Sequence, residues 1–154
     1  MKLDRIDGMK RTHYCGTLTK NEIGNEVVVC GWVQRQRDLG ALIFVDLRDR
    51  TGIVQVAFDD NTDKEIFDKA FSLRSEFVVM AKGKVRMRSS VNTEIPTGEI
   101  EIEVDTLKLL GQSQTPPFEI VENSNAKEDL RLKYRYLDLR RSDLQKNILT
   151  RHKI

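Results

Sequence analysis

The fold is decided by residues 26–58, which have the sequence EVVVCGWVQRQRDLGALIFVDLRDRTGIVQVAF. Three stretches of this segment, 26–36, 41–47 and 53–58, are rich in the β-branched and aromatic residues typical of strands. The two short connections between them contain aspartate and glycine, which favour tight turns. We therefore predict a meander of three strands.

Apolar and polar residues alternate within the second and third of these stretches. Ile43, Val45 and Leu47 share one face of the second stretch, which leaves Phe44 on the other face. Gln55 in the third stretch also lies opposite the apolar positions. Because successive side chains of a strand point to opposite sides of a sheet, we expect Phe44 and Gln55 on the solvent face.

The segment that follows adds a helix and two more strands. Apolar residues recur at helical spacing over 61–75, and alternation returns over 77–87 and 100–110. Three strands, a helix and two strands form the element order of the OB-fold, a five-stranded barrel in which the helix closes one end. We predict an all-β domain with one helix over residues 1–110, although other small barrels share parts of this order.

The composition changes after this domain. Residues 111–126 contain Pro116 and Pro117 and no basic residue, so we expect a linker there. Residues 127–154 contain nine Lys or Arg against four Asp or Glu, with many leucines and tyrosines, and are predicted to form a helical hinge. No helix-terminating signal follows residue 144, and we expect a chain truncated before a further domain.

Charge and cysteine content limit the class of protein. Because 26 basic residues nearly cancel 24 acidic ones, the net charge of +2 does not by itself indicate nucleic-acid binding. No apolar run approaches the roughly 20 residues that span a bilayer, and the charged segment 1–11 is not expected to be a secretory signal. Cys15 and Cys30 form no CxxC pair, so we expect reduced thiols in a cytoplasmic protein with no zinc site and no membrane contact.

The sequence offers no catalytic constellation. His13 and His152 lie near opposite ends of the chain, and no P-loop, GxGxxG or HExxH motif is present. Glu101 and Glu103 share one face of the last predicted strand, which favours a solvated face over acid–base chemistry. We therefore predict no catalytic residue and no metal site in this chain.

The solvent face of the first three strands is the candidate binding surface, because OB-folds bind single-stranded nucleic acid there. An exposed Phe44 could stack on an unpaired base, a contact that contributes about 1–3 kcal/mol, unless the curvature of the barrel buries the ring. Gln55 could pair with a base edge or be an ordinary exposed glutamine. Arg35 and Arg37, at the end of the first strand, could meet phosphates or a base.

Three further features have two interpretations each. Lys82, Lys84, Arg86 and Arg88 form a basic strip that could follow a phosphate backbone or protect a strand edge. Glu101 could accept hydrogen bonds from a base or be irrelevant to binding, since a carboxylate near phosphates is unfavourable. Trp32 is expected in the core or at an end of the barrel rather than as a stacking platform.

Several motifs resemble a known family. They are Arg11-Thr-His-Tyr-Cys-Gly16, Cys30-Gly-Trp-Val33, Arg37-Asp-Leu-Gly40, Phe44-Val-Asp-Leu-Arg-Asp49, Gly52-Ile-Val-Gln-Val56, Thr97-Gly-Glu-Ile-Glu101 and the run from Leu130 to Arg141. Together they resemble the anticodon-binding barrel and hinge of bacterial-type aspartyl-tRNA synthetases, which belong to class II. The barrel motifs also occur in lysyl- and asparaginyl-tRNA synthetases, whereas the first motif favours the aspartyl branch.

The resemblance implies a role for individual residues. Phe44 would stack on the middle anticodon base, a uridine, and Gln55 would form hydrogen bonds with that base. Arg37 would support the anticodon loop, and Glu101 would recognise the first anticodon base.

Arg86 and Asn92 would lie near the anticodon backbone and the third base. The loop at 89–98 differs in composition from that of the family, and Gln34 and Gln36 replace the asparagine and arginine that the family often has.

The resemblance also implies an activity and partners. The full enzyme would be a homodimer that uses ATP and Mg²⁺ to attach aspartate to tRNA-Asp, and its own catalytic domain would be a partner of this chain. Because the class II motifs would lie beyond residue 154, the chain alone is expected to be inactive and to need no cofactor. The alternatives are a generic single-strand-binding OB module, the anticodon domain of an asparaginyl- or lysyl-type synthetase, and a structural or dimerisation module.

Overall fold

The structure, a computed structural model, describes residues 2–154. The chain divides into two compact units, Met1–Thr115 and Pro116–Ile154, and each is described by itself. The division falls within 111–126, the segment proposed as a linker.

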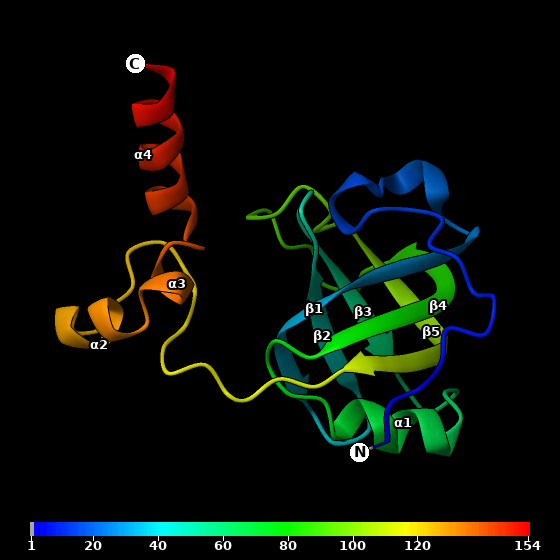
Figure 1. Ribbon diagram of the computed structural model, residues 1–154. Helices are drawn as coiled ribbons and strands as arrows, with labels where there is room; N and C mark the ends of the chain where they lie inside the picture. The colour runs from blue at the N-terminus through cyan, green and yellow to red at the C-terminus, as the bar shows by residue number, and fades with distance from the viewer. Residues whose placement is uncertain (1) are drawn as a thin grey trace. The chain divides into compact units, whose positions relative to one another are not determined.

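The first unit is a closed barrel (Figure 1). Its strands are β1 (Glu26–Asp38), β2 (Ile43–Arg48), β3 (Ile53–Phe58), β4 (Val78–Met87) and β5 (Ile100–Gly111), and helix α1 (Lys64–Phe71) lies between β3 and β4 in sequence. Neighbours around the barrel are ordered β1-β2-β3-β5-β4, with β3 and β5 parallel and the other pairs antiparallel. The OB-fold predicted from the element order is confirmed.

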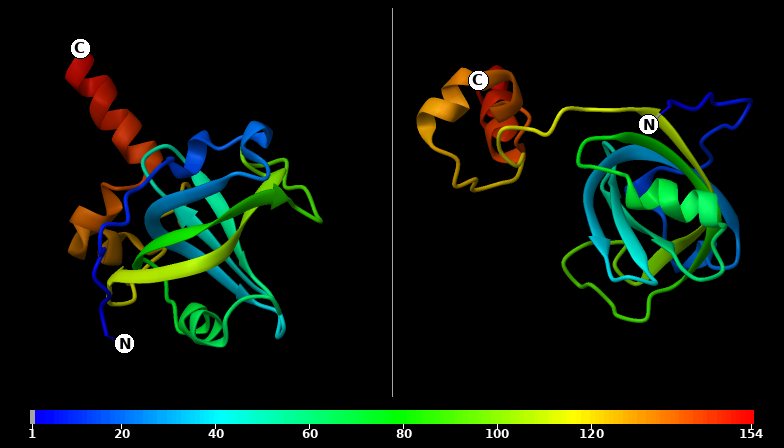
Figure 2. Two further views of the ribbon diagram at one scale, coloured as in Figure 1. Left: turned by 90° about the vertical axis from the view of Figure 1, so that its right-hand side faces the viewer. Right: turned by 90° about the horizontal axis from the view of Figure 1, so that it is seen from below.

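Helix α1 covers one end of the barrel, as the view from below shows (Figure 2). Asp63 is its N-cap, and the Asp63 carboxylate accepts a hydrogen bond from the Glu65 amide at 2.8 Å. Ile66 and Phe67 pack against the core, and Ala70 is buried. The helix is shorter than the predicted 61–75, because the residues on both sides of it form turns.

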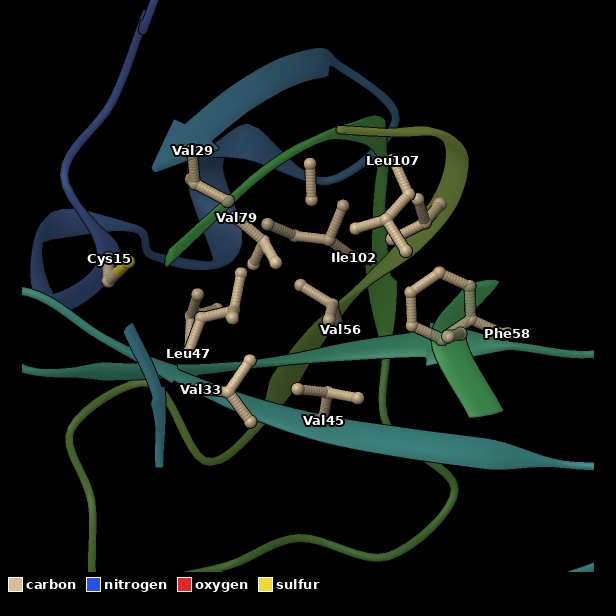
Figure 3. Packing of buried hydrophobic residues seen from close by; sticks show 14 of the residues in the cluster. Cys15, Val29, Val33, Val45, Leu47, Val56, Phe58, Val79, Ile102 and Leu107 are labelled. Atoms are coloured by element: carbon tan, nitrogen blue, oxygen red, sulfur yellow. The ribbon is translucent and has the colours of Figure 1, made fainter. Parts of the chain in front are cut away.

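The core consists of the inward side chains of all five strands (Figure 3). Ile43, Val45 and Leu47 are fully buried, as the alternation of β2 predicts, and Val56 and Ile102 meet them from β3 and β5. Burying each such side chain contributes about 1.5–3 kcal/mol. The core therefore determines which face of each strand is left for other contacts.

A segment before β1 forms two short 3-10 helices, η1 (Cys15–Thr17) and η2 (Lys20–Glu22). At η2 the Glu22 carboxylate accepts a hydrogen bond from the Thr19 amide at 2.7 Å, which completes a capping box. Cys15 is buried and unbridged, and this burial raises the pKa of its thiol.

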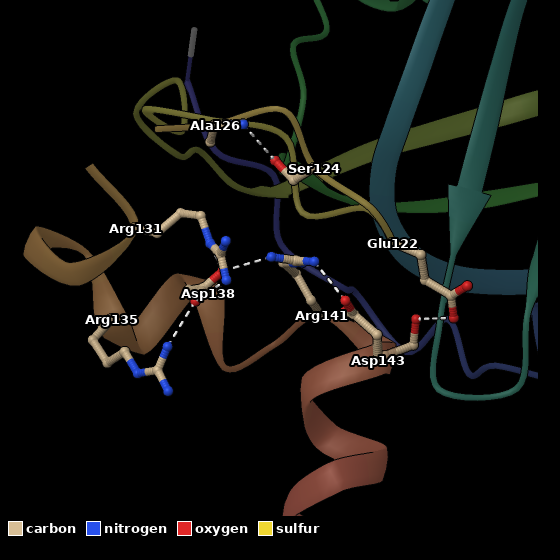
Figure 4. Close-up of polar contacts among 9 residues, drawn as sticks. Glu122, Ser124, Ala126, Arg131, Arg135, Asp138, Arg141 and Asp143 are labelled. Atoms are coloured by element: carbon tan, nitrogen blue, oxygen red, sulfur yellow. Dashed lines mark hydrogen bonds and ion pairs between the residues drawn. The ribbon is translucent and has the colours of Figure 1, made fainter. Parts of the chain in front are cut away.

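The second unit contains α2 (Glu128–Lys133), α3 (Arg135–Asp138) and α4 (Ser142–Lys153). Its centre is the fully buried carboxylate of Asp138, which binds Arg131 at 3.0 Å, Arg135 at 2.8 Å and Arg141 at 3.1 Å (Figure 4). Burial alone would raise the pKa of Asp138, but hydrogen bonds from Arg131 and Arg141 lower it. Within residues 2–154, no helix is long and apolar enough to span a membrane.

The second unit should depend on this carboxylate. Asp138→Asn would remove the anion shared by Arg131, Arg135 and Arg141 and would leave the buried Arg141 guanidinium with only its contact to Asp143. Breaking a buried ion pair in this way costs about 3–5 kcal/mol. We expect faster hydrogen exchange over 128–141, measured by mass spectrometry. Asp129→Asn, which changes an exposed acid of α2, is the matched control and should leave exchange unchanged.

The same contact predicts a pH dependence. Because the folded-state pKa of Asp138 lies below its unfolded value, its contribution to stability is complete above about pH 4 and is lost as the pH falls further. Protection of 128–141 that is equal at pH 6 and at pH 3 would contradict this assignment.

Candidate nucleic-acid interface

Five of the six candidate residues form one connected group on the outside of the barrel, here called the row. They lie in two adjacent registers, because Phe44 pairs with Ala57 of β3 whereas Gln55 pairs with Asp46 of β2. Arg37 of β1 lies opposite Phe44 of β2, and Gln55 of β3 lies opposite Glu101 of β5, which is itself opposite Arg86 of β4. The strand pairing thus brings together residues that are up to 64 positions apart, from Arg37 to Glu101. The row crosses all five strands.

Gln55 lies at the centre of the row. Its Oε1 accepts a hydrogen bond from Arg37 Nη2 at 2.8 Å, and its Nε2 donates to Glu101 Oε2 at 2.8 Å. A guanidinium can only donate and an ionised carboxylate can only accept, so these two neighbours determine which way the amide points. Only 3% of Gln55 is exposed, which corrects the expectation of an ordinary exposed glutamine.

Glu101 is held from two sides. Arg86 Nε donates to Glu101 Oε1 at 2.8 Å, while Gln55 occupies the other carboxylate oxygen. Glu101 is only 5% exposed, so its expected position on a solvated face is wrong. The strand alternation does point it outward, but the neighbouring side chains of the row cover it.

Arg86 is bound by three carboxylates. Its Nε binds Glu101, and its Nη1 lies 3.0 Å from Asp59 Oδ2 and 3.2 Å from Glu103 Oε1. Burial alone would lower the pKa of Arg86, but hydrogen bonds to Glu101 and Asp59 raise it. The single cation therefore offsets part of the charge of three acids and holds Glu101 in place.

Phe44 and Arg37 form the other end of the row. The Phe44 ring is half-buried, so part of it remains available for stacking and neither expected alternative holds in full. The Arg37 guanidinium carbon lies 5.9 Å from the ring centroid, and Arg37 Nη2 also binds Asp46 Oδ1 at 3.1 Å. Arg37 Nε is buried and makes no hydrogen bond within the described chain.

The basic strip predicted on β4 is not a continuous free surface. Lys82 binds Glu26 at 3.0 Å, and Arg86 is enclosed by acids, which leaves Lys84 as the exposed cation of the strand. Trp32 is 40% exposed rather than in the core, because its position on β1 points away from the barrel interior.

Asn92 does not join the row. It lies in the β4–β5 loop, where its Oδ1 accepts a hydrogen bond from the Glu94 backbone amide at 2.9 Å and its backbone N–H donates to Gly98 O at 2.9 Å. A Cβ on Gly98 would stand 1.6 Å from Asn92 O, so this loop requires glycine there. No hydrogen bond links Asn92 to the row within residues 2–154.

Sequence reasoning missed the acids that hold the arginines. Asp46 and Asp59 bind Arg37 and Arg86, from which they are separated by 9 and 27 residues. The outward position of Asp46 on β2 could have suggested its role, whereas no motif or alternation pointed to Asp59. In the part of the chain that the structure describes, no three His, Cys, Asp or Glu side chains gather where a metal ion could bind.

Known proteins similar to this chain include ligases and synthetases. The aspartate–tRNA(Asp/Asn) ligase of Thermoanaerobacter sp. (strain X514) is 57% identical over 98% of this chain and 26% of that protein. The aspartate–tRNA ligase of Ruminiclostridium cellulolyticum is 52% identical over the same shares. The crystal structure of asparaginyl-tRNA synthetase from Pyrococcus horikoshii, complexed with asparaginyl-adenylate, has a TM-score of 0.70 and 32% identity over 86% of this chain and 29% of that one.

The chain spans about a quarter of the length of the curated relatives that it matches. The tRNA anti-codon family model, described as an OB-fold nucleic acid binding domain, matches residues 27–110. That range covers the barrel almost from the first residue of β1 to the last residue of β5. The chain therefore belongs to the tRNA anti-codon family of OB-fold nucleic acid binding domains.

Proposed function

We propose that this barrel recognises the anticodon of tRNA-Asp as part of an aspartate–tRNA ligase. The observation that carries the proposal is the row from Arg37 and Phe44 through Gln55 and Glu101 to Arg86, because it combines an aromatic ring with oriented polar groups. The names and high identity of the ligases similar to this chain support the choice of tRNA.

Phe44 is proposed to stack on the middle anticodon base, a uridine. Its ring is half-buried, so part of its surface is left for contact with a base. The Arg37 guanidinium, 5.9 Å from the ring centroid, adds positive charge where the phosphates of the anticodon loop would approach. Stacking supplies affinity without distinguishing bases, so recognition needs a second group.

Gln55 is proposed to recognise the same uridine. Arg37 and Glu101 occupy one lone pair and one hydrogen of its amide, which leaves one acceptor and one donor. Uracil presents an imino donor beside a carbonyl acceptor, which complements this pair. The amide is already oriented by its charged neighbours, so little entropy is lost when the base binds.

Glu101 is proposed to recognise the first anticodon base, a guanine. Each of its oxygens keeps a lone pair beyond the bonds to Arg86 and Gln55, and guanine presents two adjacent donors on its pairing edge. Arg86 offsets the carboxylate charge, which would otherwise repel the RNA phosphates. Arg86 and Asn92 are proposed to lie near the anticodon backbone and the third base.

The activity of the whole protein is also a proposal. It would be a cytoplasmic homodimer that uses ATP and Mg²⁺ to join aspartate to tRNA-Asp in its catalytic domain. Neither cofactor enters the steps proposed above, which concern only RNA binding by residues 2–154. The chain by itself is expected to bind RNA without aminoacylating it.

Removal of the stacking ring should weaken RNA binding. Phe44→Ala should raise the Kd for a tRNA-Asp anticodon stem-loop by about 5- to 150-fold, the equivalent of one stacked base. Phe71→Ala is the matched control, because Phe71 is a 54% exposed aromatic residue on α1, outside the row. Fluorescence anisotropy at fixed salt would measure both variants.

Two outcomes would contradict the proposal. Equal Kd values for the parent chain and Phe44→Ala would mean that Phe44 does not contribute to RNA binding. Equal affinity of the parent chain for the GUC anticodon loop and for a scrambled loop would instead favour the generic single-strand-binding module, whose affinity depends mainly on salt.

Glu101 should determine the preference for guanine. The parent chain should bind a stem-loop with guanine as the first anticodon base about 10-fold more tightly than one with adenine, as expected for a paired contact. Glu101→Gln replaces an acceptor with a donor, so this ratio should fall toward one. Asp105→Asn, which changes an exposed acid elsewhere on β5, is the matched control and should leave the ratio unchanged. An unchanged ratio in Glu101→Gln would refute the role of Glu101.

A further inference from the structure

Strand β1 contains an extra residue that reverses its two faces. Val33 is fully buried and lies opposite Leu47, so regular alternation would also turn Arg35 and Arg37 into the barrel. Arg35 instead lies opposite Asp46, and the register shifts between Val33 and Arg35. From Val33 to Arg35 the chain of β1 advances by two residues, while from Leu47 to Asp46 β2 advances by only one. Gln34 is therefore the extra residue of a β-bulge. The bulge is thus the reason that both arginines are on the outer face.

A side-chain clamp holds this bulge. Arg48 Nη1 donates to Gln34 Oε1 at 2.6 Å, and Arg48 Nη2 donates to both carboxylate oxygens of Glu76 at 2.9 and 3.0 Å. The Glu76 side chain is 9% exposed and that of Arg48 is 22% exposed. The carboxylate therefore binds the arginine that binds the extra residue.

The backbone of Glu76 is joined to the same place. Its amide donates to Val33 O at 2.7 Å, and the Val33 amide donates to Phe77 O at 2.8 Å. Strand β1 is thus held immediately before the extra residue by the segment that leads into β4. The backbone and the side chain of Glu76 therefore both hold the bulged part of β1.

The conformation of Glu76 supports a specific role for its side chain. Its φ of +66° lies in the left-handed region, where glycine and asparagine are favoured and most other residues are strained. Such strain persists only where the surroundings require it. A glutamate at this position is explained by the two bonds of its carboxylate to Arg48, which neither glycine nor asparagine could make in the same way.

We propose that Glu76 is a positioning residue that, through Arg48 and Gln34, turns Arg35 and Arg37 toward the RNA. This inference rests on the proposed function, in which Arg37 supports the anticodon loop. The same reversal turns Gln36 inward, where its Nε2 donates to the carbonyls of Ala70 at 2.9 Å and Phe71 at 3.0 Å at the end of α1. One bulge therefore sets the outer face and also ties β1 to the helix that closes the barrel.

The first test measures the bulge without RNA. Phenylglyoxal modifies accessible guanidinium groups, and mass spectrometry gives the rate at each arginine. Glu76→Ala should change the modification rate of Arg35 several-fold, because loss of the clamp frees the bulge and with it the direction of the Arg35 side chain. Glu26→Ala, which breaks the exposed Glu26–Lys82 pair elsewhere on β1, is the matched control and should leave the rate unchanged. An unchanged Arg35 rate in folded Glu76→Ala would overturn the proposal.

The second test is a double-mutant cycle on the Kd for the tRNA-Asp anticodon stem-loop. Glu76→Ala should weaken binding about 5-fold in the parent chain and clearly less in Arg37→Ala, since neighbouring groups that act through one another are not additive. Glu76→Gln, which keeps one acceptor for Arg48, should recover part of the loss. An equal loss in both backgrounds would mean that Glu76 acts only on stability and would refute the proposal.

Failure of the proposal for Glu76 can be distinguished from unfolding of the variant and from failure of the proposed role of Arg37. If Glu76→Ala melts below the assay temperature, Gln34→Ala replaces it, because that change leaves the Arg48–Glu76 pair intact and should show the same effects at smaller size. If Arg37→Ala alone leaves the Kd unchanged, the proposed role of Arg37 in RNA binding fails. The modification rate of Arg35 would then still decide whether Glu76 sets the bulge.

Discussion

The parallel pairing of β3 with β5 is the constraint on which the rest of the barrel depends. It joins the last free edges of the sheet, so every strand finds a hydrogen-bonding partner on both sides. Parallel strands need a long connection, and here it contains α1 and β4, which cover one end and complete the wall. The same pairing places Gln55 opposite Glu101. The same strand pairing thus closes the barrel around its core and assembles the polar row.

Burial of the polar row is possible because its buried charged groups have hydrogen-bonding and ionic partners. An unpaired carboxylate in the position of Glu101 would lose several kcal/mol of hydration. Arg86 and Gln55 occupy both of its oxygens, and Asp59 and Glu103 in turn hold Arg86. The side chains that would meet RNA are therefore ordered before it arrives, which reduces the entropy lost on binding.

The second unit also buries a carboxylate by pairing it with arginines. Asp138 is fully buried among three arginines that belong to α2, α3 and the start of α4. With few large buried side chains available in so short a segment, this ion cluster connects the three helices. In the barrel a buried carboxylate orients a candidate binding surface, whereas here it holds the helices together.

Local patterns in the sequence determined the strands, the OB-fold and the inward residues Ile43, Val45 and Leu47. They could do so because strand alternation and turn preferences act over a few residues. The outward position of Phe44 was predictable for the same reason. The anticodon position assigned to each candidate residue, in contrast, rests on the family resemblance and not on any spacing.

Only the tertiary structure decided the burial of Gln55 and Glu101 and the outward direction of Arg37. The first depends on partners that lie 46 residues apart, which no local pattern joins. The second depends on a bulge that Glu76 holds from a distant loop, so simple alternation from Val33 gives the wrong face. Long-range hydrogen bonds form only when the barrel closes, and for this reason the chemistry of the surface could not be derived from the sequence alone.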